Sequence, residues 1–423
     1  MTPLAILFLM SLLADVPPEV PPETPAEASP APVVDRLALL KQVSADVERI
    51  RGLKFTKPVP MEVVSDADTR KHALQRIEDL QAKDTLDAEI AVYRLLRLVP
   101  QEGDVLESVL GALEEQVGGF YDPKRETFFL LDDMPSGMAP ALIAHELTHA
   151  VEDQVFDLDA RLRATKEDED RSFAVSAVHE GSATLVMTLY ATEALQTGKM
   201  KSEDFQAFAK TEAGRGDRLA ALPAVMYRQL IGTYILGTNF ITRGKGPTAG
   251  AKFPVADVRR VYKDGPTSSE QILHPERYWD VRDNPRPVSL GTAGEALGEG
   301  WERSADGTLG ELVLAVLVGA STPGDFATAW GVGSSGWTNA AATGWGGDHW
   351  ELWKRGEDAA VLLSTVWDTA KDAEEFAAAL GQGPTFAFRR KKKAVAIVAG
   401  IPFDSETADA ALDAVLHAAA HRK

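Results

Sequence analysis

Two histidines four residues apart, with a glutamate between them, constrain this chain more than any other feature of its sequence. The motif His145-Glu146-Leu147-Thr148-His149 follows Pro140, a residue typical of the first turn of a helix. On a helix, residues i and i+4 lie on one face one turn apart, so both imidazoles can reach one metal ion at about 2.0–2.1 Å. Glu146 would then point beside the metal, toward the place of a bound water. The motif therefore predicts a helix with a metal site on one face.

The composition limits both the metal ligands and the partners. The 423 residues include no cysteine, which excludes disulfides, cysteine-ligated zinc, iron–sulfur clusters and thiol nucleophiles. With 44 Lys and Arg against 63 Asp and Glu, the net charge of −19 argues against nucleic-acid binding. Any metal must therefore be bound by histidines and carboxylates.

A catalytic zinc has three protein ligands and one position open for water, so a third ligand is needed. Val155 stands six residues after His149, where a further histidine would extend the motif, and that class of zinc protease is excluded. Glu180 follows His149 by 31 residues, within a helical pattern over residues 172–194. We expect this second helix to pack on the first, with Gly181 allowing their close approach. The competing ligands are His179 and Asp153.

The N-terminal segments are typical of an exported protein. Leu4–Leu13 is an apolar run of about ten residues, shorter than the roughly 20 of a membrane-spanning helix. We therefore expect residues 1–14 to be a signal peptide, with an uncleaved anchor as the alternative. Residues 15–34 are rich in Pro, Glu and Ala, which predicts an extended linker. We expect no stable insertion into a membrane after removal of the signal.

From residue 35 onward the pattern is globular and largely helical. Apolar residues at helical spacing predict helices near residues 33–47, 70–81, 86–99 and 103–117, with one strand near residues 58–64. Residues 118–131 then contain two aromatic-rich β segments on either side of Asp122-Pro123, which predicts a hairpin.

The C-terminal region, residues 331–423, contains a weak internal repeat. Four residues recur thirty-five positions later: Trp353 as Phe388, Arg355 as Arg390, Leu362 as Ile397 and Leu363 as Val398. Each copy has the pattern strand, turn, strand, helix, so we expect two ββα units packed face to face. The Gly- and Trp-rich residues 331–347 would form a connecting loop or wrap back over the preceding domain.

The residues around the motif resemble those of known zinc peptidases. His145–Val151 with Asp153 is similar to the active-site helix of gluzincin metallopeptidases of the thermolysin type. Glu180-Gly181 with Ala183 is similar to the E-G-x-A around the glutamate ligand of gluzincin aminopeptidases. More specifically, residues 35–380 resemble a poorly characterised bacterial family of predicted neutral zinc metallopeptidases. Five segments carry that resemblance: residues 119–131, 144–158, 179–187, 234–240 and 269–278.

The resemblance implies a fold and a set of roles. The fold class is α+β: a mostly helical zincin-like catalytic domain with a small sheet and hairpin over residues 35–330, then a small α+β module over residues 331–423. His145, His149 and Glu180 would bind one Zn²⁺, and Glu146 would be the general base. Asp153 or Asp157 would orient a ligand histidine.

The reaction also needs a hydrogen-bond donor for the developing oxyanion besides zinc. The candidates, in decreasing order of preference, are His274, Tyr234 and Tyr278. Zincins resemble one another in presenting an edge strand just before the zinc helix, so we expect a polypeptide substrate to pair with residues 127–131. We therefore expect zinc-dependent hydrolysis of peptide bonds. The alternatives are an inactive exported binding protein that retains the zincin fold, and a zinc hydrolase of a non-protein amide.

Overall fold

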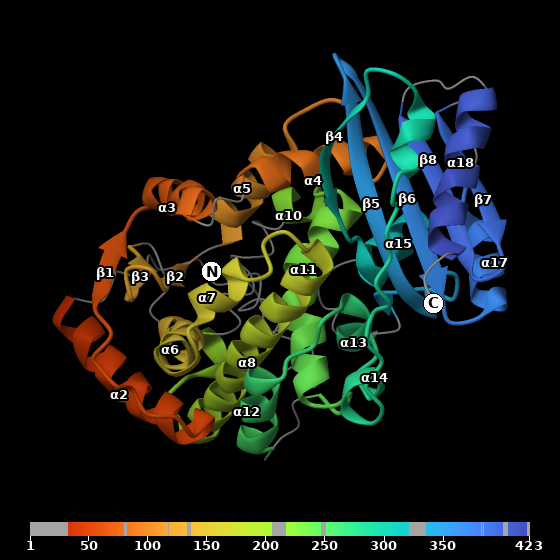
Figure 1. Cartoon of the computed structure of the whole chain (residues 1–423). Coiled ribbons are helices and arrows are strands. Elements are labelled where there is room, and N and C mark those ends of the chain that lie inside the picture. The colour runs from red at the N-terminus through yellow and green to blue at the C-terminus, as the bar shows by residue number, and fades with distance from the viewer. Residues whose placement is uncertain are drawn as a thin grey trace, which may run out of the picture.

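Figure 1 shows the computed structural model of the chain, which describes residues 33–79, 83–116, 118–132, 137–204, 217–246, 251–320, 336–381, 383, 385–400 and 405–420. Residues 1–32, where we expect the signal peptide and most of the linker, lie outside this description, so both stay predictions. None of the helices in the described ranges combines the length and the apolar character needed to span a bilayer.

The N-terminal part is helical, as the spacing of its apolar residues predicts. Its described helices are α2 (Val33–Arg51), α3 (Asp66–Asp79), α4 (Lys83–Leu95) and α5 (Val105–Gln116). Val43 and Val47, one turn apart on α2, are fully buried. Through this side α2 packs on two central helices, α6 (Ala139–Phe156) and α8 (Glu169–Gln196).

A small sheet of order β1-β3-β2 lies beside these helices. β1 (Met61–Val64) runs parallel to β3 (Thr127–Leu131), and β2 (Gly119–Asp122) pairs antiparallel with β3, which confirms the predicted hairpin. The expectation that residues 127–131 form an edge strand is wrong. β3 is the central strand and all of its residues are buried, as suits an unbroken apolar run. The half-buried β2 lies at the edge, in contact with α6.

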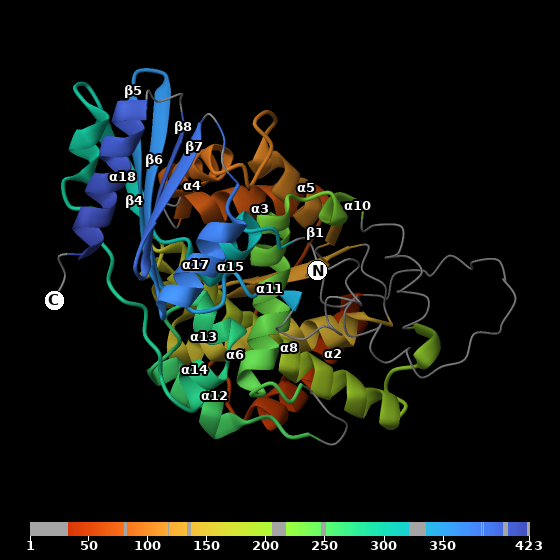
Figure 2. The same cartoon turned by 90° about the vertical axis from the view of Figure 1, so that its right-hand side faces the viewer.

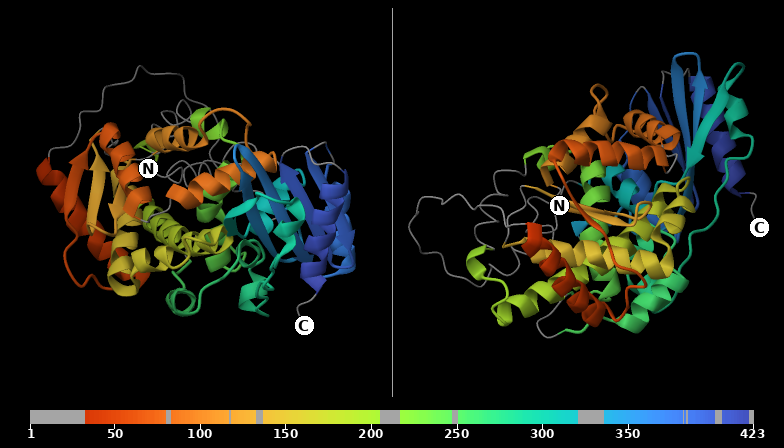
Figure 3. Two further views of the ribbon diagram at one scale, coloured as in Figure 1. Left: turned by 45° about the horizontal axis from the view of Figure 1, so that its top comes forward. Right: turned by 90° about the vertical axis from the view of Figure 1, so that its left-hand side faces the viewer.

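Helices fill the space between the two sheets of the molecule (Figure 3). In addition to α6 and α8, they are α7 (Leu158–Arg163), α10 (Asp217–Ala220), α11 (Ala224–Ile241), α12 (Val255–Lys263), α13 (Ser269–Leu273), α14 (Glu276–Trp279) and α15 (Gly310–Leu317). The 3₁₀ helix η1 (Ala293–Leu297) lies outside this space, on the other face of the C-terminal sheet.

α8 and α11 pack backbone to backbone at two glycines. A Cβ atom added to Gly181 would lie 2.2 Å from the carbonyl carbon of Gly237. A Cβ added to Gly237 would lie 1.9 Å from the carbonyl oxygen of Ala177. Both positions therefore exclude any side chain. Gly181 does allow a close helix approach, as predicted, but the prediction that its partner is the helix of the histidines is wrong: the partner is α11.

The C-terminal part is a five-stranded antiparallel sheet of order β4-β5-β6-β8-β7. Its elements are β4 (Glu302–Gly307), β5 (Trp345–Arg355), β6 (Asp358–Trp367), α17 (Ala370–Ala379), β7 (Phe386–Lys391), β8 (Ala394–Gly400) and α18 (Ser405–Ala420). The two ββα units are present, but the expectation that they pack face to face is wrong. They lie side by side in one sheet because β6 pairs with β8. In this antiparallel pair each residue opposes the counterpart of its neighbour, Leu362 with Val398 and Leu363 with Ile397.

Helices cover both faces of this sheet (Figure 2). α18 and η1 pack on the face that carries Leu362 and Val398. α17 packs on the opposite face, whose residues belong to the same buried cluster as α8 and α11. The molecule is therefore α+β, as predicted. Its larger hydrophobic core continues from the helical part into the C-terminal sheet, and a smaller one lies under α18 and η1.

The Gly- and Trp-rich stretch reaches back to the helical part. Of residues 331–347, the structure describes residues 336–347. The fully buried ring of Trp337 lies 6.4 Å from that of Tyr227 on α11, measured between centroids. Arg228 of the same helix donates a hydrogen bond to the Trp337 carbonyl. Of the two arrangements expected, the stretch thus wraps over the preceding domain.

The glycine contact between α8 and α11 can be tested by substitution. We expect Gly237→Ala to lower the free energy of unfolding by about 3 kcal/mol, the upper range for overpacking, because its methyl group would overlap the Ala177 carbonyl. Gly232→Ala on the same helix is the matched control, since a Cβ there lies 3.4 Å from its nearest neighbours and alanine favours a helix by about 1 kcal/mol. Urea-induced unfolding measures both. Equal midpoints for the two variants would contradict the contact.

Candidate metal centre

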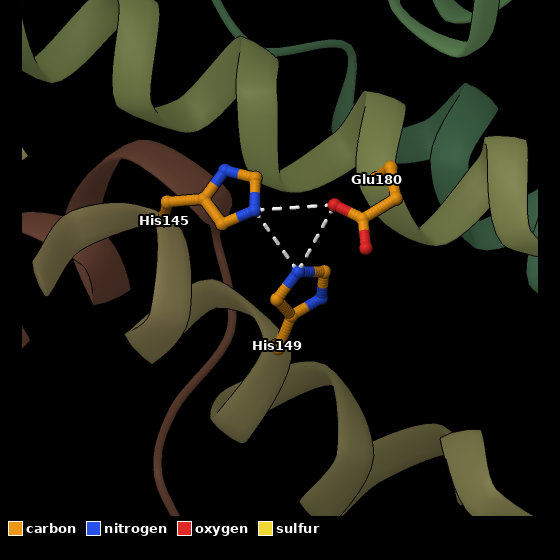
Figure 4. A group of neighbouring side chains, drawn as sticks. All are labelled: His145, His149 and Glu180. Atoms are coloured by element: carbon orange, nitrogen blue, oxygen red, sulfur yellow. Dashed lines mark hydrogen bonds and ion pairs between the residues drawn. The ribbon is translucent and has the colours of Figure 1, made fainter. Parts of the chain in front are cut away.

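α6 presents both histidines of the motif on one face. Pro140 lies in its first turn, as predicted, and the helix ends at Asp157, which adopts a left-handed φ of 54°. The side chain of His145 is fully buried, whereas that of His149 is 13% exposed. Figure 4 shows both rings directed from α6 toward the same point.

Glu180 of α8 reaches that point from the other side (Figure 4). The Nε2 atoms of His145 and His149 lie 3.1 Å apart. Oε2 of Glu180 lies 3.2 Å from the first of these atoms and 3.4 Å from the second. The Glu180 side chain is 23% exposed, so the group opens toward solvent. The structure thus brings together the three residues to which the sequence assigns the metal.

The spacing of these three atoms fits a tetrahedral metal ion. Two bonds of about 2.0–2.1 Å at the tetrahedral angle separate their ligand atoms by about 3.3–3.4 Å. The observed separations of 3.1 to 3.4 Å are close to that value. Imidazole nitrogens and a carboxylate oxygen also suit zinc and other transition metals. The group can therefore hold a divalent metal ion.

The charges of the group favour a cation at its centre. Burial opposes ionisation of Glu180, but His149 and His145 hold the pKa of its carboxyl well below the usual range. Burial likewise disfavours the charged ring of His149, yet the adjacent Glu180 carboxylate raises the pKa of His149 to about 9. The carboxylate thus attracts positive charge to the atoms that converge on it.

Glu146 lies beside the group and is held by the small sheet. Its side chain is buried, and its Oε2 accepts a hydrogen bond from the backbone N–H of Tyr121 at 2.9 Å. Burial raises the pKa of the Glu146 carboxyl, and the nearby His145 and His149 lower it only in part. Because Tyr121 is in β2, the edge strand fixes the orientation of this carboxylate.

Tyr234 of α11 is the predicted donor that the structure brings to the group. Its ring is buried and lies 6.1 Å from that of His145, between centroids. Burial, together with the nearby carboxylates of Glu180 and Glu146, raises the pKa of Tyr234 well above its usual value. The hydroxyl therefore stays protonated beside the metal ligands.

The two other donor candidates are hydrogen-bonded elsewhere. His274 Nε2 pairs with the buried carboxylate of Glu311, 2.9 Å away on α15. The Tyr278 hydroxyl donates to the backbone carbonyl of Asp264 at 2.6 Å. No contact described for either side chain reaches the three metal-site residues. A catalytic role of His274 stays a prediction from the sequence, and Tyr278 has a structural role in this arrangement.

The two competing ligands, His179 and Asp153, contact other residues. His179 points to α12, where its ring stacks 5.7 Å from that of Tyr262, and burial lowers the pKa of His179 to about 3. Asp153 accepts hydrogen bonds from the Tyr121 hydroxyl and from the backbone N–H of Leu158.

The expected orientation of a ligand histidine by an aspartate is not found. Asp157 accepts from the backbone N–H of Ala160 and thereby caps α7, and Asp153 is bonded as described above. Nδ1 of His145 is buried and has no hydrogen-bond partner among the described residues. Neither aspartate therefore bonds to Nδ1 of His145.

A second acidic group, Glu270 with Asp283 and Asp368, also has the spacing of metal ligands. Arg277 fills its centre, because its Nη1 lies 2.7, 2.9 and 2.8 Å from the three carboxylates in that order. The guanidinium already supplies the positive charge that such a group requires. It is therefore an ion-pair network that ties α13 and α14 to the end of β6.

Comparison with known proteins bears on the C-terminal part. Residues 297–412 match the family model of a domain of unknown function, DUF8575. The matched range takes in the five-stranded sheet and lies after His145, His149 and Glu180. No curated protein and no solved structure matches the chain.

Sequence reasoning missed two contacts near the group. The first is the hydrogen bond from the backbone N–H of Tyr121 to Glu146. Almost every residue has a backbone N–H, so the residue type at position 121 could not predict this bond. Glu152 is different. It is fully buried, and it follows His149 by three residues and His145 by seven, which places it on the same face of α6. That spacing was a signal for a buried carboxylate next to the ligands.

The assignment of the ligands predicts how metal content responds to substitution. We expect His145→Ala, His149→Ala and Glu180→Ala each to lose most of the bound metal, because two of the three ligand atoms hold an ion far more weakly than three. Asp153→Ala and His179→Ala should keep about one metal ion per chain. Metal analysis of the purified variants, after incubation with zinc and desalting, gives the result. Full metal retention in Glu180→Ala would exclude that ligand.

Proposed function

We propose that this protein is a zinc-dependent peptidase of the gluzincin type. The observation that carries the proposal is the convergence of His145, His149 and Glu180, with a second carboxylate, that of Glu146, beside them and outside the ligand set. A structural zinc site is normally closed by a fourth protein ligand, whereas a catalytic site keeps an open position. The partial exposure of His149 and Glu180 supports access of a substrate to that position.

The roles of the side chains follow from their places. When bound, zinc would act as a Lewis acid on the scissile carbonyl and lower the pKa of a coordinated water. Glu146, oriented by the Tyr121 N–H, accepts a proton from the attacking water and delivers it to the leaving amine. The hydroxyl of Tyr234 donates a hydrogen bond to the oxyanion that develops at the carbonyl.

We further propose a polypeptide substrate that lies between β2 and α8. β2 is an edge strand, and its Tyr121 already reaches Glu146, so a peptide paired with this edge would lie beside the general base. A cavity of about 480 Å³ runs along α8 and is lined by residues that include Ser176, one turn before Glu180, and Thr233, next to Tyr234. This space, along the helix that carries Glu180, supports binding of an extended substrate.

We also propose that the enzyme is exported and does not bind nucleic acid. The apolar run Leu4–Leu13, followed by a Pro- and Glu-rich tract, supports export, and the net charge of −19 disfavours contact with a phosphate backbone.

The role of Glu146 can be tested by a nearly isosteric change. We expect Glu146→Gln to keep about one zinc per chain but to reduce peptide cleavage by about 10²–10⁴-fold, because the amide cannot accept the proton. Glu126→Gln, at the exposed turn between β2 and β3, is the control and should cleave normally. A peptide library analysed by mass spectrometry, with zinc content measured in parallel, provides both readouts. Undiminished cleavage by Glu146→Gln would exclude its role as base.

Removal of the metal distinguishes the proposal from its alternatives. We expect 1,10-phenanthroline to abolish cleavage and zinc to restore it. Free zinc at 100 times its dissociation constant should also raise the free energy of unfolding by about 2.7 kcal/mol, since the unfolded chain lacks the site. Zinc binding without cleavage of any library peptide would instead support the inactive binding protein or the hydrolase of a non-protein amide. Absence of zinc binding would exclude both zinc hydrolases and leave the inactive binding protein.

A further inference from the structure

A fully buried ionic network lies one helical turn from the metal group. Its centre is Glu152 of α6, whose side chain is inaccessible to solvent. Oε1 of Glu152 accepts hydrogen bonds from Nε of Arg51 and from the hydroxyl of Ser182. Oε2 accepts from the hydroxyl of Tyr262 at 2.7 Å. One carboxylate therefore receives donors from three further helices, α2, α8 and α12.

The network lies on the same two helices as the three metal-site residues. Glu152 follows His149 by three residues and His145 by seven, so it shares their face of α6. Ser182 follows Glu180 by two residues on α8. The bond between Glu152 and Ser182 thus joins the helix of the two histidines to the helix of the glutamate, close to the place where their ligand atoms must meet.

Stability alone gives no reason for this arrangement. Burial of an ion pair is expensive, and apolar residues of the same volume are often as stable or more so. Arg51 illustrates the expense, because its two Nη atoms are buried without a hydrogen-bond partner among the described residues. The network instead fixes the position of α6 relative to α8, because the Glu152 carboxylate on α6 must meet three donors from other helices.

We propose that Glu152, together with Ser182 and Tyr262, positions the metal ligands by fixing the spacing of α6 and α8. None of the three touches the metal, so they act through His145, His149 and Glu180. The proposal rests on metal binding at that group, which the proposed function also requires. It adds that the affinity and the geometry of the metal depend on hydrogen bonds outside the ligand set.

The test compares two equally buried tyrosines in the full-length protein. Tyr262→Phe removes the hydroxyl bonded to Glu152, and Tyr278→Phe removes one bonded to the Asp264 carbonyl, away from the metal group. The two side chains are 2% and 1% exposed. We expect Tyr262→Phe to raise the dissociation constant for zinc, measured by competition with a chelating dye, by about 10–100-fold. Tyr278→Phe should leave that constant unchanged.

The coordination geometry gives a second readout that a merely structural role would not change. We expect the visible absorption spectrum of the cobalt(II)-loaded protein to differ in Tyr262→Phe and to be unaltered in Tyr278→Phe. Ser182→Ala, a smaller change in the same network, should shift zinc affinity and spectrum in the same direction, and it tests the proposal if Tyr262→Phe does not fold.

The outcomes separate this inference from the proposed function. Lower unfolding temperatures for Tyr262→Phe and Ser182→Ala with unchanged zinc affinity and cobalt spectrum would overturn the inference and leave the peptidase untouched. If the unsubstituted protein binds metal but cleaves no peptide, the proposed function fails and the positioning role is still measured by affinity and spectrum. If the unsubstituted protein binds neither zinc nor cobalt, both are wrong.

Discussion

The packing of α8 against α6 is the constraint on which the rest of the candidate metal centre depends. Neither helix carries all three candidate ligands. The three ligand atoms come within 3.4 Å of one another only because of the distance at which the two helices pack. A third helix, α11, is fixed to α8 by the glycine contact and thereby places Tyr234 beside Glu180. The site is thus a product of helix packing rather than of one local motif.

Much of this could be predicted from the sequence, because the deciding features are local. Helical periodicity placed α2 to α5, and the i, i+4 spacing placed His145 and His149 on one face. Glu180 could be predicted because a carboxylate on a second helix packed against the first completes a His-His site. The structure places Glu180 beside the two histidines. The repeat in the C-terminal region likewise identified two ββα units.

The incorrect predictions about packing concern partners that are distant in sequence. Residues 127–131 form a central strand because β1, more than sixty positions earlier, pairs with them, and no property of those residues identifies that partner. Gly181 indicated a close contact without identifying α11. The pairing of His274 with Glu311 likewise had no signal in the sequence, and a catalytic role of His274 stays a prediction. Hydrophobic spacing indicates which side of a helix or strand faces the core, whereas only the tertiary structure shows which element packs against that side.

The continuity of the core between the helical part and the C-terminal sheet couples the C-terminal part to the metal group. Since Arg228 on the helix of Tyr234 is bonded to the carbonyl of Trp337, the C-terminal part supports the same helix that carries Tyr234. Truncation of the chain before Trp337 would therefore remove a contact that holds α11, and would disturb the surroundings of Glu180 from a distance.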